Sequence, residues 1–277
     1  MALADMFDGF ILDLDGVVYV GDEPVPGSPE TIVALQRAGK RVLYLTNDAR
    51  RTREGYAAKL RRLGVPADAA DVITCGAATA ACIRADGRAD GHTAYVIGST
   101  ALAGEMAGAG LHLLHGAEGR SADVVVVGGH EAFDFAQLRT ATQAVLGGAA
   151  LYGTNRDATF PMPDGPWPGT GSILAAVEFA TGRTARVAGK PEAFIFDMAG
   201  RAVARALAET GGPAPAGASA GPARVAMVGD RLDADIAGGH RAGLGTILVL
   251  SGCTRAQDLA GAEVPPDHVV ERLAGVL

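Results

Sequence analysis

Residues 10–19 read FILDLDGVVY, an apolar run that ends in two aspartates and a glycine. Side chains of a strand alternate between its faces, so Asp13 and Asp15 are expected on the same side, at the carboxyl end. Open α/β sheets bind ligands at that end of their strands. Two such carboxylates call for a cation, a shared proton or both, because burying an unpartnered charge is costly. On its own, the same pattern also fits a solvated loop.

A second apolar run, residues 225–228, is followed by Asp230. In a parallel sheet, this strand-end acid can face the first pair and complete an oxygen-rich magnesium site. The sequence therefore predicts that Asp13, Asp15 and Asp230 surround one Mg²⁺ ion.

Two smaller signals fit the same site. Thr46 and Asn47 end another apolar run, where a hydroxyl and an amide are suited to hydrogen-bond phosphoryl oxygens. Pro191 biases Lys190 toward an extended backbone, and a lysine near carboxylates and phosphate would neutralise charge. Taken singly, Thr46 and Asn47 also fit a helix cap, and Lys190 also fits an exposed lysine.

Short apolar runs alternate with helical stretches along the whole chain, which is typical of a parallel sheet covered by helices. We predict strands at residues 10–14, 41–46, 94–97, 123–127, 224–228 and 246–250. We predict helices at residues 28–38, 52–63, 135–146, 171–180, 193–209 and 233–242. The predicted helix stops are Gly39, Gly64, Gly182, Gly211 and Gly243. The expected fold class is α/β.

Composition excludes several classes of protein. The chain has 277 residues and a net charge of −7, so we expect no nucleic-acid partner. It has no apolar run long enough to cross a membrane and no basic leader, which favours a cytoplasmic location. Three cysteines without a C-x-x-C pair indicate neither a disulfide framework nor a zinc site. Residues 211–223, GGPAPAGASAGPA, are predicted to form a flexible loop.

The order DLDG, TN, KP and GDRLDAD resembles the haloacid dehalogenase superfamily of phosphotransferases over essentially the whole chain. Residues 13–27 and 152–161 are similar to those of its subclass IIA. The resemblance implies a Rossmann-like parallel-sheet core, residues 1–75 and 183–277. It also implies an inserted α/β cap domain, residues 76–182, which selects the substrate and through which a homodimer is possible.

The resemblance also implies roles for individual residues. Asp13 would attack phosphorus and form an aspartyl-phosphate, and Asp15 would act as general acid and then as general base. Asp13, Asp230 and the main-chain carbonyl of Asp15 would bind Mg²⁺, with Asp235 orienting the site. The remaining roles are binding of the phosphoryl group by Thr46 and Asn47, and charge compensation by Lys190.

In the cap, Asn155, Arg156 and Asp157 lie in the segment that resembles the substrate-facing loop. Arg156 could meet an anionic leaving group, and it equally fits a surface arginine. The chain departs from the subclass at Asp48 and Ala49, where relatives often have Asn and Ser; this removes hydrogen-bond donors and adds an acid beside the phosphate loop.

The function implied is a magnesium-dependent phosphatase acting on a small phosphomonoester. Candidate substrates are a sugar phosphate, glycerol 3-phosphate, 2-phosphoglycolate, a nucleotide monophosphate and pyridoxal phosphate, among which the sequence does not choose. One alternative is a non-catalytic relative that binds a phosphorylated ligand, although the set of polar residues is complete. Another is a DxD glycosyltransferase, which would leave Asp230 and Lys190 without roles.

Overall fold

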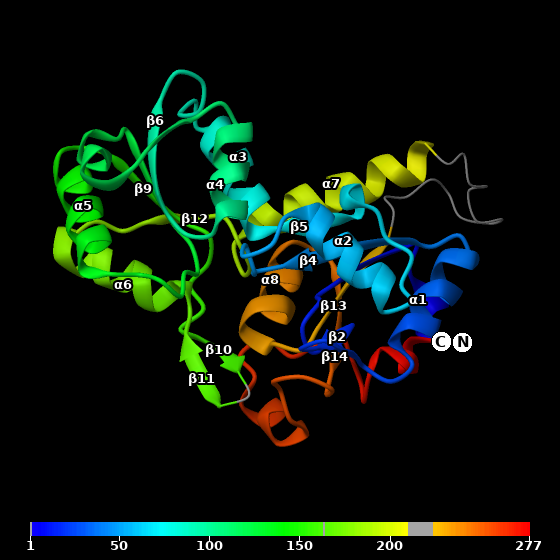
Figure 1. Cartoon of the computed structure of the whole chain (residues 1–277). Helices are drawn as coiled ribbons and strands as arrows, with labels where there is room; N and C mark the ends of the chain where they lie inside the picture. The colour runs from blue at the N-terminus through cyan, green and yellow to red at the C-terminus, as the bar shows by residue number, and fades with distance from the viewer. Residues whose placement is uncertain (1, 163, 210–223) are drawn as a thin grey trace. The chain divides into compact units, whose positions relative to one another are not determined.

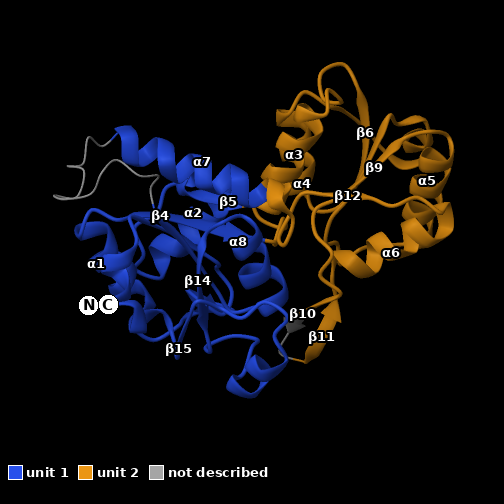
Figure 2. Cartoon of the chain, turned by 180° about the vertical axis from the view of Figure 1, so that it is seen from behind, with its two compact units in different colours: residues 1–46, 53–73, 195–277 blue, residues 47–52, 74–194 orange. Residues whose placement is uncertain are grey.

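The computed structural model describes residues 2–162, 164–209 and 224–277 (Figure 1). The predicted loop at residues 211–223 and the predicted helix stop at Gly211 lie outside these ranges. The chain divides into two compact units (Figure 2). Unit 1 comprises residues 1–46, 53–73 and 195–277, and unit 2 comprises residues 47–52 and 74–194.

Unit 1 is built on a six-stranded sheet with the order β15-β14-β13-β1-β4-β5. Its strands are β1 (Gly9–Leu12), β4 (Arg41–Thr46), β5 (Val72–Thr74), β13 (Val225–Gly229), β14 (Gly245–Val249) and β15 (His268–Val270). The central strand β1 runs parallel to both of its neighbours, β13 and β4. Every residue of β1 and β13 is buried, which explains why these strands are continuous apolar runs.

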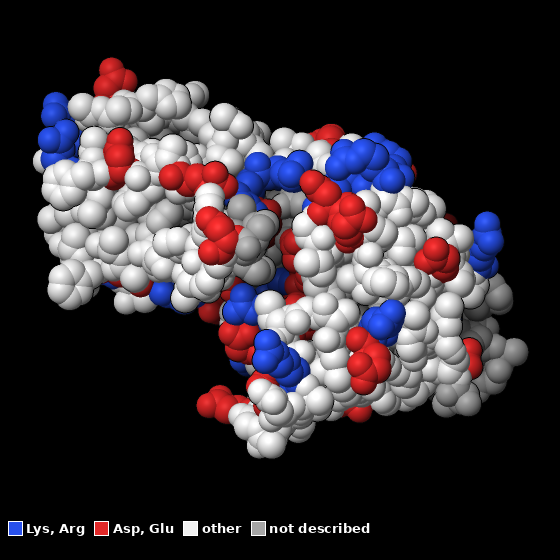
Figure 3. Space-filling model, turned by 60° about the horizontal axis from the view of Figure 1, so that its bottom comes forward, with Lys and Arg blue, Asp and Glu red and all other residues white. Residues whose placement is uncertain are grey.

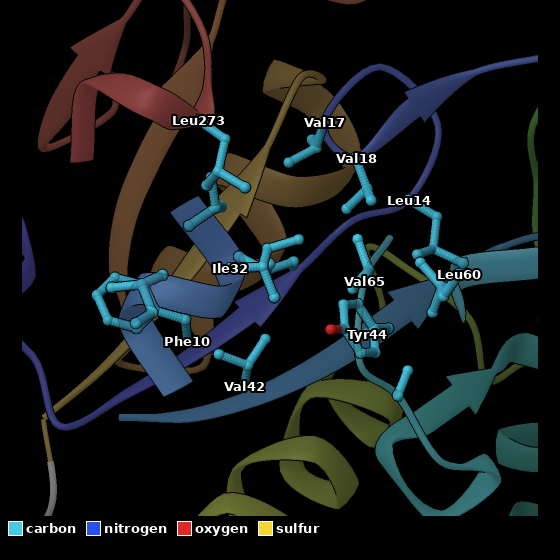
Figure 4. Close-up of a cluster of buried hydrophobic side chains, with 14 of the residues drawn as sticks. Phe10, Leu14, Val17, Val18, Ile32, Val42, Tyr44, Leu60, Val65 and Leu273 are labelled. Atoms are coloured by element: carbon cyan, nitrogen blue, oxygen red, sulfur yellow. The ribbon is translucent and has the colours of Figure 1, made fainter. Parts of the chain in front are cut away.

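Helices cover both faces of this sheet. Phe10 and Val42 point to one face, where they form a core with Ile32 of α1 (Ser28–Arg37) and Leu60 of α2 (Arg53–Arg62) (Figure 4). Gly9 faces the other side of the sheet. A Cβ added to Gly9 would lie 2.5 Å from the side chain of Val203 in α7 (Ala193–Glu209). The shorter α8 (Ala237–Arg241) packs against Met227 on the same side.

Unit 2 has its own parallel sheet, with the order β12-β9-β8-β6-β7. Its strands are β6 (Thr93–Ile97), β7 (His112–Leu114), β8 (Val124–Val127), β9 (Ala150–Gly153) and β12 (Arg186–Val187). The helices are α3 (Cys75–Ala85), α4 (Thr100–Gly108), α5 (Phe135–Leu146) and α6 (Thr170–Thr181). Val125 and Val127 pack with residues of α5 and α6 in one core. An antiparallel hairpin, β10 (Thr159–Met162) and β11 (Gly165–Pro168), precedes α6.

The boundaries of the two units differ from the predicted core and cap boundaries. Residues 183–194, expected in the core, belong to unit 2. The reason is β12, which pairs in parallel with β9 and so extends the unit 2 sheet. The segment 47–52 and residues 74–75, also expected in the core, belong to unit 2 as well.

The predicted α/β fold class is confirmed, and most predicted elements are present. All six predicted strands are found within one or two residues of their expected bounds, and α5 and α7 match theirs. Left-handed glycines follow four of the predicted helices: Gly39, Gly64, Gly182 and Gly243. The remaining short elements are η1 (Leu3–Met6), β2 (Tyr19–Val20), β3 (Glu23–Pro24), η2 (Ala69–Asp71), η3 (Gly116–Ser121), η5 (Ala256–Gly261) and η6 (Leu273–Val276).

The predicted helix at residues 233–242 is wrong in its first half. The chain there forms a π-helical segment, η4 (Leu232–Ile236), and the α-helix α8 begins only at Ala237. Single π-helical turns occur frequently at functional sites, because the wider turn re-aims side chains. Here the π-helical segment carries Asp235, one of the predicted site residues.

Candidate active site

Three buried carboxylates lie together in unit 1. Asp13 follows β1 and Asp230 follows β13, two parallel neighbours that pair Leu12 with Val228. Asp235 comes from the π-helical segment. One carboxylate oxygen from each aspartate lies within 4.8 Å of the others, and the three residues are 8%, 2% and 0% exposed, respectively. Parallel strand pairing thus brings together acids that are far apart in the sequence.

Backbone amides orient each of these carboxylates. The bonds run from Leu14 N–H to Asp13 Oδ1 (2.7 Å), from Cys253 N–H to Asp230 Oδ2 (2.6 Å) and from Arg231 N–H to Asp235 Oδ2 (3.1 Å). Because main-chain donors are fixed by the fold, the carboxylates are held in place before any ligand binds. Such preorganisation is what electrostatic catalysis requires.

Glycines make room for the carboxylates. A Cβ on Gly229 would fall 2.2 Å from the Cβ of Asp235, and a Cβ on Gly252 would fall 1.9 Å from Asp230 Oδ2. Gly16 has φ +81°, and its Cβ would lie 2.5 Å from the same oxygen of Asp230. The segment after β1 and the segment after β14 therefore approach Asp230 more closely than any side chain would permit.

The chemistry of this cluster fits a divalent cation. Three buried carboxylates within reach of one another repel, and burying them without a compensating charge is costly. Oxygen ligands are those that Mg²⁺ prefers. The donor set therefore fits a magnesium ion, which would remove the repulsion.

Asp15 differs from its neighbour Asp13. It is exposed, and its carboxylate is not one of the three in the cluster. The backbone turns after it, where Gly16 N–H donates to the carbonyl oxygen of Tyr19 at 2.8 Å. The side chain of Asp15 is therefore outside the buried carboxylate cluster.

In unit 2, Asn47 is joined to Lys190 by a pair of hydrogen bonds. Asn47 Nδ2 donates to the carbonyl oxygen of Lys190 at 2.9 Å, and Lys190 N–H donates to Asn47 Oδ1 at 2.8 Å. Gly189 packs closely here, since a Cβ on it would lie 2.8 Å from Asn47 Oδ1. Asn47 follows directly after Thr46, the buried last residue of β4. Hydrogen bonds between the side chain of Asn47 and the main chain of Lys190 therefore join the TN and KP segments of the sequence.

Asn155 and Asp157 also form hydrogen bonds with Asn47. Asn155 Nδ2 donates to the carbonyl oxygen of Asn47 at 2.7 Å, and Asp157 Oδ2 accepts from Asn47 Nδ2 at 3.1 Å. The buried Cys75 thiol donates to the same carbonyl oxygen at 2.8 Å, and desolvation by burial raises its pKa to about 12. Sequence reasoning missed Cys75, because an isolated cysteine carries no signal. These contacts make Asn47 the centre of a network of polar residues.

Comparison with known proteins identifies the family. The sequence model of the Haloacid dehalogenase-like hydrolase family matches residues 10–112, and a second model, of HAD-hydrolase-like sequences, matches residues 187–276. Human chronophin is 38% identical over 283 residues, covering 96% of this chain and 90% of chronophin. The chain belongs to the haloacid dehalogenase-like hydrolases.

Other relatives narrow the place of the chain within the haloacid dehalogenase-like hydrolases. Glycerol-3-phosphate phosphatase of Gallus gallus is 36% identical over 298 residues, covering 98% of this chain and 91% of that protein. A crystal structure of glycerol phosphate phosphatase from Mycobacterium tuberculosis in complex with magnesium matches with a TM-score of 0.85 and 33% identity, covering 100% of this chain and 78% of that one. The predicted resemblance to subclass IIA is confirmed, and the chain is a phosphatase of the haloacid dehalogenase type. Mg²⁺ is the cofactor of such phosphatases, in agreement with the carboxylate cluster.

Arg156 of this haloacid dehalogenase-like phosphatase forms an ion pair with Glu178 within unit 2. Its guanidinium donates to both carboxylate oxygens of Glu178, at 2.8 and 3.0 Å, and to the carbonyl oxygen of Ala185 at 3.3 Å. The hydrogen bond from Arg156 holds the pKa of Glu178 below its usual value. Glu178 lies on α6, and nothing in the sequence pairs it with Arg156.

Asp48, one of the two positions at which the sequence differs from the subclass, is paired with Arg50 in the structure. Arg50 donates from Nε and from a terminal nitrogen to the two oxygens of Asp48, at 2.9 and 3.0 Å. The same guanidinium lies 3.5 Å from Glu131 and stacks on the ring of Phe160, 4.6 Å from its centroid. The additional acid beside Asn47 is therefore accompanied by a compensating arginine.

The surface of the molecule carries both signs of charge. Acidic and basic side chains are interspersed over the face in Figure 3. Among the described residues, no helix is both long and apolar enough to span a bilayer.

Proposed function

We propose that the chain is a magnesium-dependent phosphomonoester hydrolase that acts on a small phosphorylated metabolite through an aspartyl-phosphate. The observation that carries this proposal is the buried carboxylate of Asp13, which is oriented by Leu14 N–H and lies in a cluster with Asp230 and Asp235. A nucleophile for phosphorus must be fixed in position and must remain anionic beside a negatively charged phosphate. A cation bound to the cluster supplies that condition.

Asp13 attacks phosphorus, and the bond from phosphorus to the leaving oxygen breaks. Asp15 gives its proton to the leaving oxygen and later removes a proton from the water that hydrolyses the aspartyl-phosphate. The exposure of Asp15 supports this role, since a group that serves first the leaving alcohol and then water must be reachable by both. Thr46 binds the transferring group, and Lys190 offsets its charge.

Magnesium would be held by Asp13, Asp230 and the main-chain carbonyl of Asp15, with Asp235 beside them. When bound, it offsets the charge of the phosphoryl oxygens, which favours attack by an anion. Asp235 accepts a hydrogen bond from Arg231 N–H, which supports its assignment to orienting the site. Asn47, Asn155, Arg156 and Asp157 complete the substrate-binding set, and the hydrogen bonds of Asn155 and Asp157 with Asn47 support a shared role.

We further propose that unit 1 is the catalytic core and unit 2 the specificity cap. Unit 2 has its own sheet and its own hydrophobic core, as a domain that closes over a site requires. The same proposal includes a homodimer formed through the cap and a cytoplasmic location.

The test is phosphate release from a panel of small phosphomonoesters, with and without Mg²⁺. Asp13→Asn keeps the shape of the side chain and removes its charge, so turnover should disappear. Asp233→Asn is the matched control, because Asp233 is 75% exposed, pairs with Arg231 and is not one of the three clustered aspartates. It should retain most of the activity.

Persistence of turnover in Asp13→Asn, or equal turnover without Mg²⁺, would contradict the proposed mechanism. A folded wild-type protein that binds inorganic phosphate but hydrolyses no ester would favour the non-catalytic alternative.

A further inference from the structure

The chain turns sharply after β1, and this turn carries Asp15. The carbonyl oxygen of Leu14 accepts hydrogen bonds from the amides of Val18 and Tyr19, at 2.9 and 3.2 Å. Gly16 N–H donates to the carbonyl oxygen of Tyr19 at 2.8 Å. Asp15 and Tyr19 also form an isolated β-bridge. The position of the Asp15 main chain is therefore coupled to that of Tyr19.

Lys59 of α2 contacts Tyr19 and the residue two places after it. Lys59 Nζ lies 3.6 Å from the centroid of the Tyr19 ring and donates to the carbonyl oxygen of Gly21 at 2.7 Å. Tyr19 begins β2, and Gly21 lies between β2 and β3, so the two contacts fix the β2–β3 hairpin. Lys59 is 6% exposed and Tyr19 is 1% exposed. A cation over an aromatic ring is held more strongly when both are shielded from water.

The charge of Lys59 is not needed to fill space. Lys59 lies among buried residues of α2, such as Leu60. Burying an ammonium group is costly, and an apolar side chain of similar volume would fill the same space at a lower cost. Asp22, whose carboxylate lies 3.6 Å from Lys59 Nζ, is 78% exposed and offsets little of this cost. The charge therefore indicates a specific task, namely the contacts with Gly21 and Tyr19.

We propose that Lys59 is a positioning residue for Asp15: it fixes the β2–β3 hairpin, and the hairpin fixes the turn that presents the Asp15 carboxyl group. All of these residues belong to unit 1. Asp15 is exposed, so the direction of its side chain depends strongly on the main chain that carries it. A general acid must reach the leaving oxygen at hydrogen-bond distance, so a small displacement slows proton transfer. This inference rests on the proposed function, in which Asp15 is the general acid.

Two aryl esters of similar shape provide the test. Phenoxide is a more basic leaving group than 4-nitrophenoxide, so hydrolysis of phenyl phosphate depends more on a general acid. The value of kcat/KM covers the steps up to departure of the leaving group, and later hydrolysis of the aspartyl-phosphate does not enter it. The ratio of kcat/KM for phenyl phosphate to kcat/KM for 4-nitrophenyl phosphate therefore measures general-acid catalysis. This ratio does not depend on the fraction of the protein that is folded.

Lys59→Met keeps a long side chain and removes the ammonium group. With Mg²⁺ present, this variant should lower the ratio about three- to tenfold relative to the wild type. Lys40→Met is the matched control. Lys40 also donates from Nζ to a main-chain carbonyl of unit 1, that of Phe7, at 2.7 Å, but it precedes β4 and so lies at the opposite end of the sheet from Asp15. Lys40→Met should leave the ratio unchanged.

Asp15→Asn sets the scale of the effect, because it removes the proton donor itself and should lower the ratio more than Lys59→Met does. An unchanged ratio in Lys59→Met, or an equal fall in Lys40→Met, would overturn the inference while the phosphatase function stands. An unchanged ratio in Asp15→Asn would overturn the role of Asp15 as general acid, and the inference with it. Absence of turnover of both esters by the wild type would overturn the proposed function itself.

Discussion

The carboxylate cluster of unit 1 and the Asn47 network of unit 2 are built in different ways. The cluster uses strand ends, and its acids are oriented by backbone donors of nearby turns. The network uses side-chain amides that reach across 143 residues to Lys190 and 108 residues to Asn155. A sheet fixes charged groups without help from other side chains, whereas a network depends on every member. The two sites should therefore respond differently to substitution.

The largest effect is expected in the cluster. Asp230→Asn removes one carboxylate while its amide oxygen can still accept from Cys253 N–H, so the local fold should persist. The kcat/KM should fall about 10²–10³-fold, the order seen when a preorganised electrostatic group is removed. Steady-state kinetics over a range of Mg²⁺ concentrations measures the loss and should show a raised metal requirement. Near-wild-type activity at low Mg²⁺ would exclude Asp230 from the metal site.

The next effect is expected in the network. Asn47→Ala deletes the bonds to Lys190 and Asp157, so kcat should fall about 10- to 100-fold as Lys190 loses its fixed position. Asn47→Asp is the informative comparison, because it keeps the acceptor for Lys190 N–H and adds repulsion with Asp157. It should recover part of kcat at most. If both variants match the wild type, the network does not position Lys190.

Magnesium should stabilise unit 1 more than unit 2. A ligand at 100 times its dissociation constant adds about 2.7 kcal/mol to the free energy of unfolding of the part that binds it. Trp167, the single tryptophan, lies on β11 in unit 2, so its fluorescence reports on that unit. Urea unfolding with Mg²⁺ or with EDTA should shift the far-UV circular dichroism more than the Trp167 fluorescence. Equal shifts would mean that the two units unfold as one.

The smallest effect concerns Glu178, which forms the ion pair with Arg156. Its pKa is lowered in the folded state, so its contribution to stability is present above the unfolded value of 4.5 and is lost as the pH falls through the folded value. Glu178→Gln should lower the free energy of unfolding by about 0.5–1 kcal/mol at pH 7, and the difference should shrink below pH 4.5. Urea titrations of both proteins at several pH values measure it. A difference independent of pH would point to packing instead of charge.

Two acids of the cluster could be predicted from sequence because each follows an apolar run, whereas Asp15, expected beside them, lies outside the three clustered carboxylates. Asp13 and Asp230 mark the ends of β1 and β13, and parallel pairing is the expected arrangement for such runs. Asp235 was expected as a neighbouring acid only from the family resemblance, and the π-helical segment that carries it was not predicted. The same local reasoning located Thr46 at the end of β4.

The rest could not be predicted, because it depends on pairs that only the fold creates. Glu178 and Arg156 lie 22 residues apart with no periodic relation, and Cys75 has no neighbours in sequence that indicate its contact with Asn47. The helices α3 and α4 were missed because both are rich in alanine and glycine and have weak apolar periodicity. The hairpin of β10 and β11 was missed because its strands contain prolines, which disfavour a strand prediction.

The division of the chain bears on how specificity could be exchanged between relatives. Unit 2 consists of two pieces, residues 47–52 and 74–194, separated by α2 and β5 of unit 1. A graft of residues 74–194 alone would import Asn155 and Asp157 from the donor but leave Asn47 and Asp48 from the host. Crossovers that flank only residues 74–194 therefore combine network residues of two different proteins, whereas transplanting both pieces together keeps those of one. An exchange of specificity between relatives, whether engineered or evolved, therefore has to transfer residues 47–52 together with residues 74–194.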